Sequence, residues 1–291
     1  MSGFARRMQQ AAAHLSSANG ALSFDHVFLI ALENSDRSTI IGSSSAPNIN
    51  SYVSTYAQCT HYHSIYHPSL PNYFQVTTGS DQGTSGGDDT SPTISVSNVF
   101  ANMTSDGISW KTYAENLPSP YTNWNHYTAG SPYDVGEYSS RHVPAVFFNS
   151  IMSSSTERAK VVDYTQLATD LSGGTVPQFA WITPNRIDDM HDGTVSQMDT
   201  WVGNAVSAIK SSTSWTVNKS LIILWWDEDG EDGQTNNQLV ASVFIAKNVV
   251  SAGYSSSRAY GHLNVLSTIQ SVLGVSQDLS GGAAVMSDLF S

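Results

Sequence analysis

Polar side chains follow two apolar runs of the sequence at the point where each run ends. Glu33 and Asn34 come directly after FDHVFLIAL, and Asp227 and Glu228 come directly after LIILWW. Both runs are typical of buried strands. Neighbouring parallel strands end at one edge of a sheet, where ligands of open α/β folds bind. Carboxylates gathered there repel one another, and a hard divalent cation with oxygen ligands would relieve the repulsion. The alternative is that DEDGEDG is a solvated acidic turn.

The segment HPSLPNY, residues 67–73, has the residue types of a nucleophilic site. Pro68 and Pro71 make its turn rigid, so that Ser69 is presented outward with Asn72 three residues later. A serine hydroxyl needs a base or a metal ion to become a good nucleophile. Asn72 could then donate a hydrogen bond to a phosphoryl oxygen. An ordinary turn bounded by prolines is the alternative.

Two histidines complete the chemically suggestive set. His191 lies in PNRIDDMHDG, directly after the expected strand QFAWIT, and could protonate a leaving group or bind a phosphoryl oxygen. His142 lies in RHVP before an apolar run. By itself, His142 would as readily be a surface residue or a hydrogen-bonded residue of the core.

The elements that position these groups alternate short apolar strands with amphipathic helices, which favours an α/β fold. Strands are expected at 24–32, 109–114, 178–183, 221–226 and 240–246. Helices are expected at 47–57, 97–106, 199–211 and 262–273, the third with an acidic first turn and the fourth ended by Gly274. Long loops are expected at 78–92 and 115–140. No linker divides the chain, so we expect one catalytic domain over 23–291, preceded by an extension at 1–22.

Composition narrows the class of partner. The net charge is −12, and only 12% of the residues are charged, about half the usual share. Without clustered Lys and Arg we expect no nucleic-acid partner, and an anionic substrate would need a local cation. Cys59 is the single cysteine, so no intramolecular disulfide forms. No run of about 20 apolar residues predicts a membrane span. The abundance of uncharged polar residues is common in exported enzymes, although 1–22 is a poor signal peptide.

Seven motifs in order resemble the phosphoesterase family, which contains acid phosphatases and the non-haemolytic type of phospholipase C. They are EN (33–34), HPSLPNY (67–73), WKTYAENLP (110–118), RHVP (141–144), PNRIDDMHDG (184–193), WWDED (225–229) and GHLNVLSTIQSVLG (261–274). The resemblance extends over about 24–274. It implies an alkaline-phosphatase-like three-layer α/β/α sandwich with a mostly parallel central sheet.

The resemblance also implies a site. A divalent metal ion, of unspecified identity, would be held by Glu33, Asn34, Ser69, Asp227 and Glu228. The phosphate pocket would be lined by Asn72, His142 and His191, with His262 near its rim. The sequence departs from the family pattern at 35–37 and at 186–187, which puts the substrate preference in doubt but removes no proposed ligand.

The expected activity is therefore hydrolysis of phosphate monoesters through a phosphoserine at Ser69, with a phospholipase C-like phosphodiesterase as the alternative. The substrate would be a small phosphorylated compound or a phospholipid headgroup, and the oligomeric state is left open. A more distant alternative is an α/β-hydrolase using Ser85 of GTSGG, which is followed by a poor helix sequence. A glycan-binding module would use the aromatic residues of the long loop, but it would leave the acidic cluster unexplained.

Overall fold

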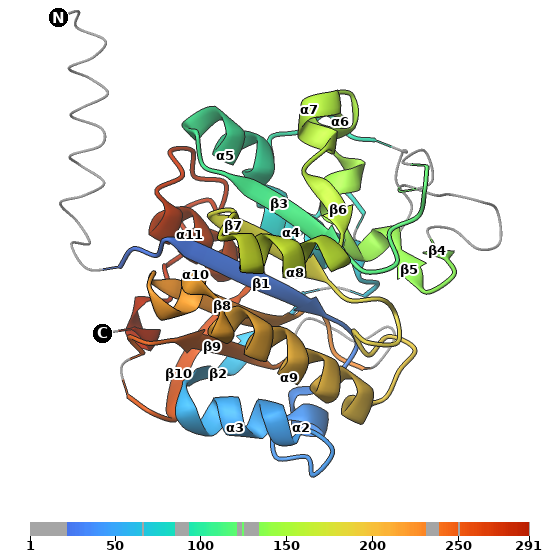
Figure 1. The fold of residues 1–291 in the computed structure, drawn as a ribbon. Helices are drawn as coiled ribbons and strands as arrows, with labels where there is room; N and C mark the ends of the chain where they lie inside the picture. The colour runs from blue at the N-terminus through green and yellow to red at the C-terminus, as the bar shows by residue number, and fades with distance from the viewer. Residues whose placement is uncertain are drawn as a thin grey trace, which may run out of the picture.

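The computed structural model describes residues 22–65, 67–84, 93–120, 124, 134–230, 239–249 and 251–290. Eight of the described strands form one sheet (Figure 1). Their order is β10 (Tyr254–Gly261), β2 (Ala57–His63), β9 (Ser242–Ala246), β8 (Ser220–Trp226), β1 (His26–Leu32), β7 (Phe179–Thr183), β3 (Trp110–Ala114) and β6 (Val161–Asp163). Only β9 pairs in antiparallel fashion with its neighbours, so the expectation of a mostly parallel sheet is confirmed.

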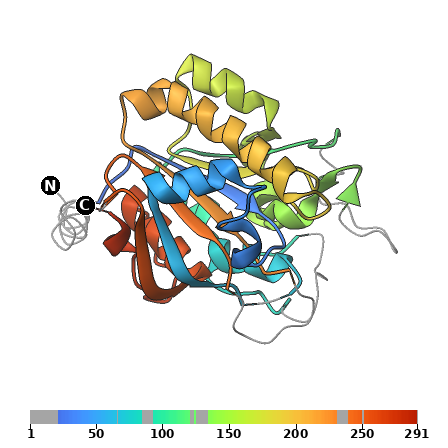
Figure 2. The same cartoon turned by 90° about the horizontal axis from the view of Figure 1, so that it is seen from below.

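Helices cover both faces of this sheet, which makes the fold a three-layer α/β/α sandwich (Figures 1 and 2). One face carries α3 (Pro47–Thr55), α8 (Thr165–Gly173), α9 (Val195–Ser211) and the short α10 (Thr213–Thr216). The other carries α4 (Leu70–Thr78), α5 (Val99–Asp106) and α11 (His262–Leu273). The predicted architecture is therefore confirmed. No helix of the described residues has both the length and the apolar composition needed to cross a membrane.

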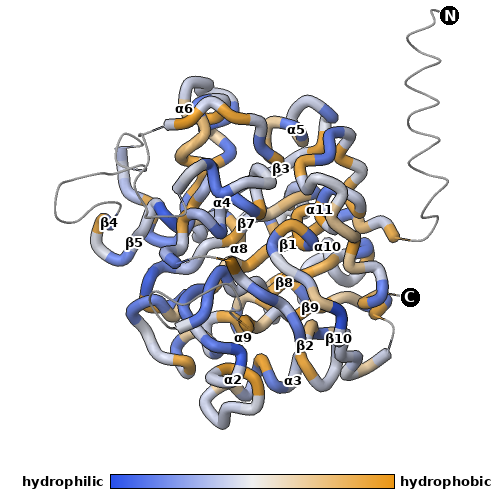
Figure 3. Tube along the Cα trace, turned by 180° about the vertical axis from the view of Figure 1, so that it is seen from behind, coloured by the Kyte–Doolittle hydropathy of each residue, from blue (hydrophilic) through white to orange (hydrophobic). Residues whose placement is uncertain are grey.

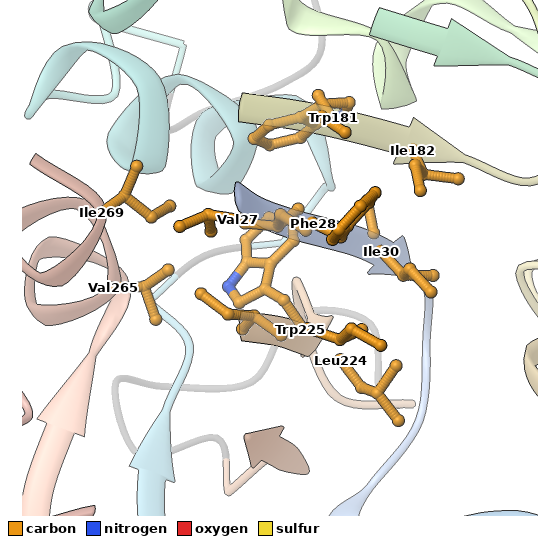
Figure 4. Close-up of a cluster of buried hydrophobic side chains, with 14 of the residues drawn as sticks. Val27, Phe28, Ile30, Trp181, Ile182, Leu224, Trp225, Val265 and Ile269 are labelled. Carbon is orange, nitrogen blue, oxygen red and sulfur yellow. The ribbon is translucent and has the colours of Figure 1, made fainter. Parts of the chain in front are cut away.

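The two strands that end in acidic residues are neighbours at the centre of the sheet. β1 and β8 pair in parallel from His26–Ser220 to Leu32–Trp226, as the sequence predicts. Both faces of the strands are covered, which explains why their sequences are continuously apolar rather than alternating. Figure 4 shows side chains of β1, β7, β8 and α11 meeting in this core, and in Figure 3 apolar segments gather around β1 and β7.

The remaining short elements connect the layers. They are α2 (Arg37–Ile40), β4 (Asp134–Val135), β5 (Tyr138–Ser139), η2 (Ser140–His142), η3 (Pro144–Phe147), α6 (Asn149–Met152), α7 (Ser155–Arg158) and η4 (Ser287–Leu289). β4 and β5 form a small hairpin that leads directly into η2 and its His142.

One predicted helix start and one predicted turn need correction. Helix α9 begins at Val195, so Asp199 is not in its first turn. The Asp199 carboxylate instead accepts hydrogen bonds from the backbone N–H groups of Asn48 and Ile49 at the start of α3, where Ala46 offers no side-chain cap. The expected turn at 67–73 is helical from Leu70 onward, and Pro71 is tolerated in α4 because the first turn of a helix needs no amide donor there.

Other predictions lie outside the described residues. They concern the structure of 1–21, the Ser85 region of the loop at 78–92, and residues 121–123 and 125–133 of the aromatic loop at 115–140. The strands β2, β6 and β10 and the helix α8 were not predicted, because their sequences are short or mix polar and apolar residues without clear periodicity.

Candidate active site

Helix α4 presents three polar side chains to the carboxyl edge of the sheet. Ser69 directly precedes the helix, without a capping hydrogen bond from its side chain, and Asn72 and Tyr73 lie three and four residues later, on the same face. All nine residues of α4 are buried, and Ser69 itself is 2% exposed. The positive end of the helix dipole therefore points to the place where Ser69 meets β1 and β8, which favours a bound anion.

The Ser69 hydroxyl lies between two carboxylates. Its Oγ is 3.1 Å from Glu33 Oε2 and 3.1 Å from Glu228 Oε1. A hydroxyl has one proton and can satisfy only one of these acceptors at a time. Glu33, Asp227 and Glu228 each offer an oxygen within 4.8 Å of the others, and all three are buried. The residues predicted from the ends of two strands and from the proline-bounded turn are thus brought together.

Burial and mutual repulsion perturb this cluster. Burial, and then the charges of Glu33 and Glu228, raise the pKa of Asp227 well above its usual value. Burial also raises the pKa of Glu228 to about 8, although hydrogen bonding from His67 opposes the shift. Burial lowers the pKa of His67, but its bonds to Glu228 and Asp229 outweigh burial and raise it to about 9. By themselves, the carboxyl groups of Asp227 and Glu228 therefore keep their protons to a higher pH than an isolated carboxyl group does.

Two oxygen atoms at these strand ends have no hydrogen-bond partner among the described residues. They are Asn34 Oδ1 and Asp227 Oδ2, both buried at the atom level. A buried acceptor without a donor is costly, and two of them beside a cluster of carboxylates match what a divalent cation with oxygen ligands would satisfy. The donor set of carboxylates, an amide oxygen and a hydroxyl therefore fits a hard or borderline metal ion.

His142 and His191 also lie close to Glu33. His142 Nε2 is 3.2 Å from Glu33 Oε1, and its Nδ1 is 2.8 Å from Asp189 Oδ2. Burial lowers the pKa of His142 to about 4. Burial also lowers the pKa of His191, but Glu33 and Asp192 outweigh it, so that the pKa is raised overall. Glu33, His142 and His191 form a second group close enough to share one ligand.

His262 occupies a different place from the one expected. It is 0% exposed and lies behind Asn72, where its Nε2 is 3.1 Å from Asn72 Oδ1 and 2.8 Å from the Asp227 carbonyl oxygen. It lies away from the pocket's rim because α11 packs on α4 and directs its first residue inward. Burial lowers the pKa of His262 to about 3.

Three residues of the site carry roles that sequence reasoning missed. Tyr73 donates to Glu33 Oε1 at 2.6 Å, and its ring stacks on His142. His67 bridges Glu228 and Asp229, at 3.2 and 2.7 Å. Asp189 contacts His142, as described above. Tyr73 and His67 lie inside HPSLPNY, so the motif was recognised although their partners were not.

Charged residues connect the segment of His191 to its neighbours. Asp192 contacts both His191 Nδ1 and Arg186 Nη1 at 2.7 Å. Arg186 also contacts Asp134 and donates to the Gly136 carbonyl oxygen, so it ties the β4–β5 hairpin to the loop after β7. This loop carries His191, and the hairpin leads into η2 with His142. The contact therefore joins the two segments whose histidine rings lie 5.5 Å apart.

The fold and the site together define a class of protein. The structure resembles a protein of the alkaline phosphatase superfamily from Vibrio parahaemolyticus, with a TM-score of 0.58, 15% identity, and coverage of 89% of this chain and 69% of that one. It also resembles the phosphonate monoester hydrolase of Agrobacterium radiobacter, with a TM-score of 0.55, 13% identity, and coverage of 86% and 74%. The architecture is therefore alkaline-phosphatase-like.

The chain belongs to the phosphoesterase family, whose model matches residues 40–276. It is 29% identical over 262 residues to the phosphatidylinositol-3-phosphatase of Mycobacterium tuberculosis, covering 89% of this chain and 80% of that protein. It is 27% identical over 256 residues to an acid phosphatase of Aspergillus fumigatus, covering 87% of this chain but 56% of that protein. The chain is accordingly a phosphoric ester hydrolase.

Proposed function

We propose that the protein is a metal-dependent phosphomonoesterase in which Ser69 forms a phosphoserine intermediate. The observation that carries this proposal is the position of Ser69 Oγ, 3.1 Å from both Glu33 Oε2 and Glu228 Oε1 at the positive end of a buried helix. This arrangement provides a nucleophile, two acceptors for its proton and a place for an anion. The names of the relatives, an acid phosphatase and a lipid phosphatase, support hydrolysis of monoesters.

A divalent cation would be held by the oxygen atoms of five residues, namely Glu33, Asn34, Ser69, Asp227 and Glu228. The partnerless Asn34 Oδ1 and Asp227 Oδ2 support this assignment. When bound, such a cation stabilises the serine oxyanion and the charge of the phosphoryl group. It would also reverse the sign of the local field, which a chain of net charge −12 needs in order to attract a phosphate.

The chain's own groups provide the proton transfers. Ser69 gives its proton to Glu33 or Glu228 as Oγ bonds to phosphorus, and the bond to the leaving oxygen breaks in line. His191, whose pKa is raised, donates a proton to the departing alcohol. In the second step water attacks phosphorus and gives a proton to His191 while the P–Oγ bond breaks. Ser69 Oγ takes its proton back from the same glutamate, and free phosphate leaves.

Asn72 and His142 face the phosphoryl oxygens in this proposal. The amide of Asn72 lies 3.4 Å from Glu228 Oε2, beside the nucleophile. Burial raises the pKa of Asp189 well above its usual value, so a neutral Asp189 carboxyl can donate to His142 Nδ1. His142 then carries its proton on Nε2, the nitrogen that lies 3.2 Å from Glu33 Oε1 at the site. Preorganised donors of this kind stabilise charge that develops during phosphoryl transfer.

The substrate class follows from the same site and from the relatives. We infer a small phosphate monoester or the phosphorylated headgroup of a phospholipid, with a phospholipase C-like diesterase as the alternative. We further infer one catalytic domain over 23–291. An extracytoplasmic location is proposed from the low content of charged residues and from the resemblance to acid phosphatases.

The first experiment compares two chromogenic substrates, p-nitrophenyl phosphate and p-nitrophenylphosphorylcholine, before and after prolonged chelation. Monoester turnover that is lost on chelation and restored by a divalent cation supports the proposal. Preferential turnover of the diester changes the assignment to a phospholipase C-like enzyme. Turnover that survives complete removal of metal refutes metal dependence.

Substitution of the nucleophile has a matched control in the same chain. Ser69→Ala should reduce monoester turnover to below about 1% of the wild-type rate, because nucleophilic catalysis is lost. Ser85→Ala tests the α/β-hydrolase alternative and should leave the rate unchanged. If Ser85→Ala is inactive on p-nitrophenyl butyrate and Ser69→Ala is not, the esterase reading is correct and the phosphatase proposal fails.

A further inference from the structure

A buried imidazole lies one layer behind the proposed phosphate pocket. His262 begins α11 and is fully buried, and each of its ring nitrogens has partners. Nε2 is near the Asp227 carbonyl oxygen at 2.8 Å and Asn72 Oδ1 at 3.1 Å. Nδ1 is near the Tyr62 hydroxyl at 2.9 Å and Trp225 Nε1 at 3.0 Å. Neither nitrogen is left for a substrate.

The partners of His262 determine where its proton resides. A backbone carbonyl only accepts, so the contact with Asp227 requires a proton on Nε2. The indole of Trp225 only donates, so its contact requires a lone pair on Nδ1. Both constraints are met by the neutral imidazole protonated on Nε2. The single N–H of Trp225 is shared between Nδ1 and the Tyr62 oxygen, which lies 2.9 Å from the indole nitrogen, and the Tyr62 hydroxyl in turn donates to Nδ1.

This proton position orients the amide of Asn72. Because His262 Nε2 donates, the Asn72 atom that faces it is the oxygen Oδ1, which also accepts from the Ile65 N–H at 3.4 Å. The amide nitrogen is consequently turned to the other side, where it lies 3.4 Å from Glu228 Oε2. The two N–H donors of Asn72 thus lie on the side of Ser69, where Nδ2 is 3.4 Å from Glu228 Oε2 and 3.5 Å from the Pro68 carbonyl oxygen. Without the His262 donor, the two amide orientations would be closer in energy.

We propose that His262 is a positioning residue that acts through Asn72: with Tyr62 and Trp225 it holds the Asn72 amide with its donors toward the phosphoryl group. His262 also anchors the main chain at Asp227, between β8 and the acidic residues that follow. The proposal rests on the proposed function, since it assigns Asn72 to a phosphoryl oxygen. In this proposal His262 does not contact the substrate directly.

A double-mutant cycle tests this relation. Asn72→Ala should lower kcat for p-nitrophenyl phosphate by about 100-fold, which is typical of removing one donor to a developing oxyanion. His262→Ala should lower kcat by about 10- to 100-fold with metal content unchanged. Combined with Asn72→Ala, His262→Ala should add less than about threefold, because its effect passes through the same amide. Losses that multiply in the double variant overturn the proposal.

Two further variants guard against a merely structural effect. His262→Gln keeps an amide donor near the position of Nε2 and should recover at least about tenfold of the activity that alanine loses. Tyr62→Phe keeps the buried ring and should reduce kcat by less than fivefold, since Trp225 still donates to Nδ1. If glutamine is as inactive as alanine although it folds and binds metal equally well, the donor role is refuted.

A readout without turnover separates this proposal from the proposed function. In ¹⁵N NMR spectra at pH 7, the His262 ring should show a protonated Nε2 and an unprotonated Nδ1, and His262→Gln should shift the Asn72 side-chain amide signals. The opposite tautomer refutes the proposal whatever the enzyme hydrolyses. Absence of phosphatase activity in the wild-type protein, together with the expected tautomer, refutes the proposed function but not the orientation of Asn72 by His262.

Discussion

Replacing Tyr73 by Phe removes one hydroxyl and nothing else from the active site. That hydroxyl donates to Glu33 Oε1 at 2.6 Å, and both residues are 0% exposed. The ring would keep its contacts with His142, Trp181 and Trp225. Glu33 would keep the Ser69 contact on its other oxygen. The substitution therefore tests only the hydrogen bond that Tyr73 donates to Glu33, a proposed metal ligand.

The expected loss follows from the strength of this hydrogen bond. A bond to a charged group contributes about 1.5–3 kcal/mol, which is about 10- to 150-fold in an equilibrium constant. Substitution of residues that orient metal ligands typically costs about 10- to 100-fold in affinity or activity. We therefore expect Tyr73→Phe to weaken divalent-metal binding, or to lower kcat/KM for p-nitrophenyl phosphate, by about 10- to 100-fold.

The assay measures metal affinity by competition with a chelator, and kcat/KM at saturating metal. Tyr113→Phe is the matched control, because its hydroxyl donates to the Asp170 carboxylate at 2.7 Å in a buried site on another part of the sheet. Both variants should lose stability, but only Tyr73→Phe should lose metal affinity or activity. If Tyr73→Phe stays within twofold of wild type in both measurements, Glu33 does not depend on Tyr73 and the reasoning fails.

Three other predictions test the site and the fold. Asp227→Asn should reduce the amount of bound divalent metal at least tenfold, measured by elemental analysis after dialysis. Asp106→Asn, at an exposed position, should not reduce it. Equal metal content in the two variants would contradict the proposed set of ligands. Gly193→Ala should lower kcat/KM by about 10- to 100-fold, because a Cβ would lie 1.9 Å from the Ile187 carbonyl oxygen and displace the loop of His191. Gly173→Ala in α8 should leave kcat/KM unchanged, because its Cβ would meet nothing nearer than 3.6 Å. Asp170→Asn should cost about 2–4 kcal/mol of unfolding free energy at pH 7 and less at pH 3 in urea titrations. Burial raises the pKa of Asp170, but hydrogen bonds from Lys111 and Tyr113 outweigh burial and lower the pKa overall. The stability that the ionised Asp170 contributes is therefore present above the usual pKa of about 3.9 and is lost as the pH falls through the lowered pKa. An Asp170→Asn cost that is unchanged between the two pH values would refute that assignment.

Local sequence predicted the central part of the fold well. The runs FDHVFLIAL and LIILWW became β1 and β8, because continuous apolar sequence is stable only where both faces of a strand are covered. Gly274 ends α11 in the left-handed region at φ 73°, as its position after an amphipathic run predicts. The predicted start of α9 was wrong, since residues near it make contacts with distant segments. Asp199 is one such residue, because its partners lie at the start of α3.

The sequence by itself identified the residue types of the site and the strand ends at which they lie. Strand ends can be recognised locally, and parallel pairing then brings Glu33 and Glu228 to one edge. Only the tertiary structure decided which atoms face each other: that Tyr73 supports Glu33, that His67 bridges two carboxylates, and that His262 lies behind Asn72. These relations depend on how α4 and α11 pack against the sheet and against each other. The direction of a side chain across such a contact is set by packing between segments that lie 40 to 190 residues apart in the sequence.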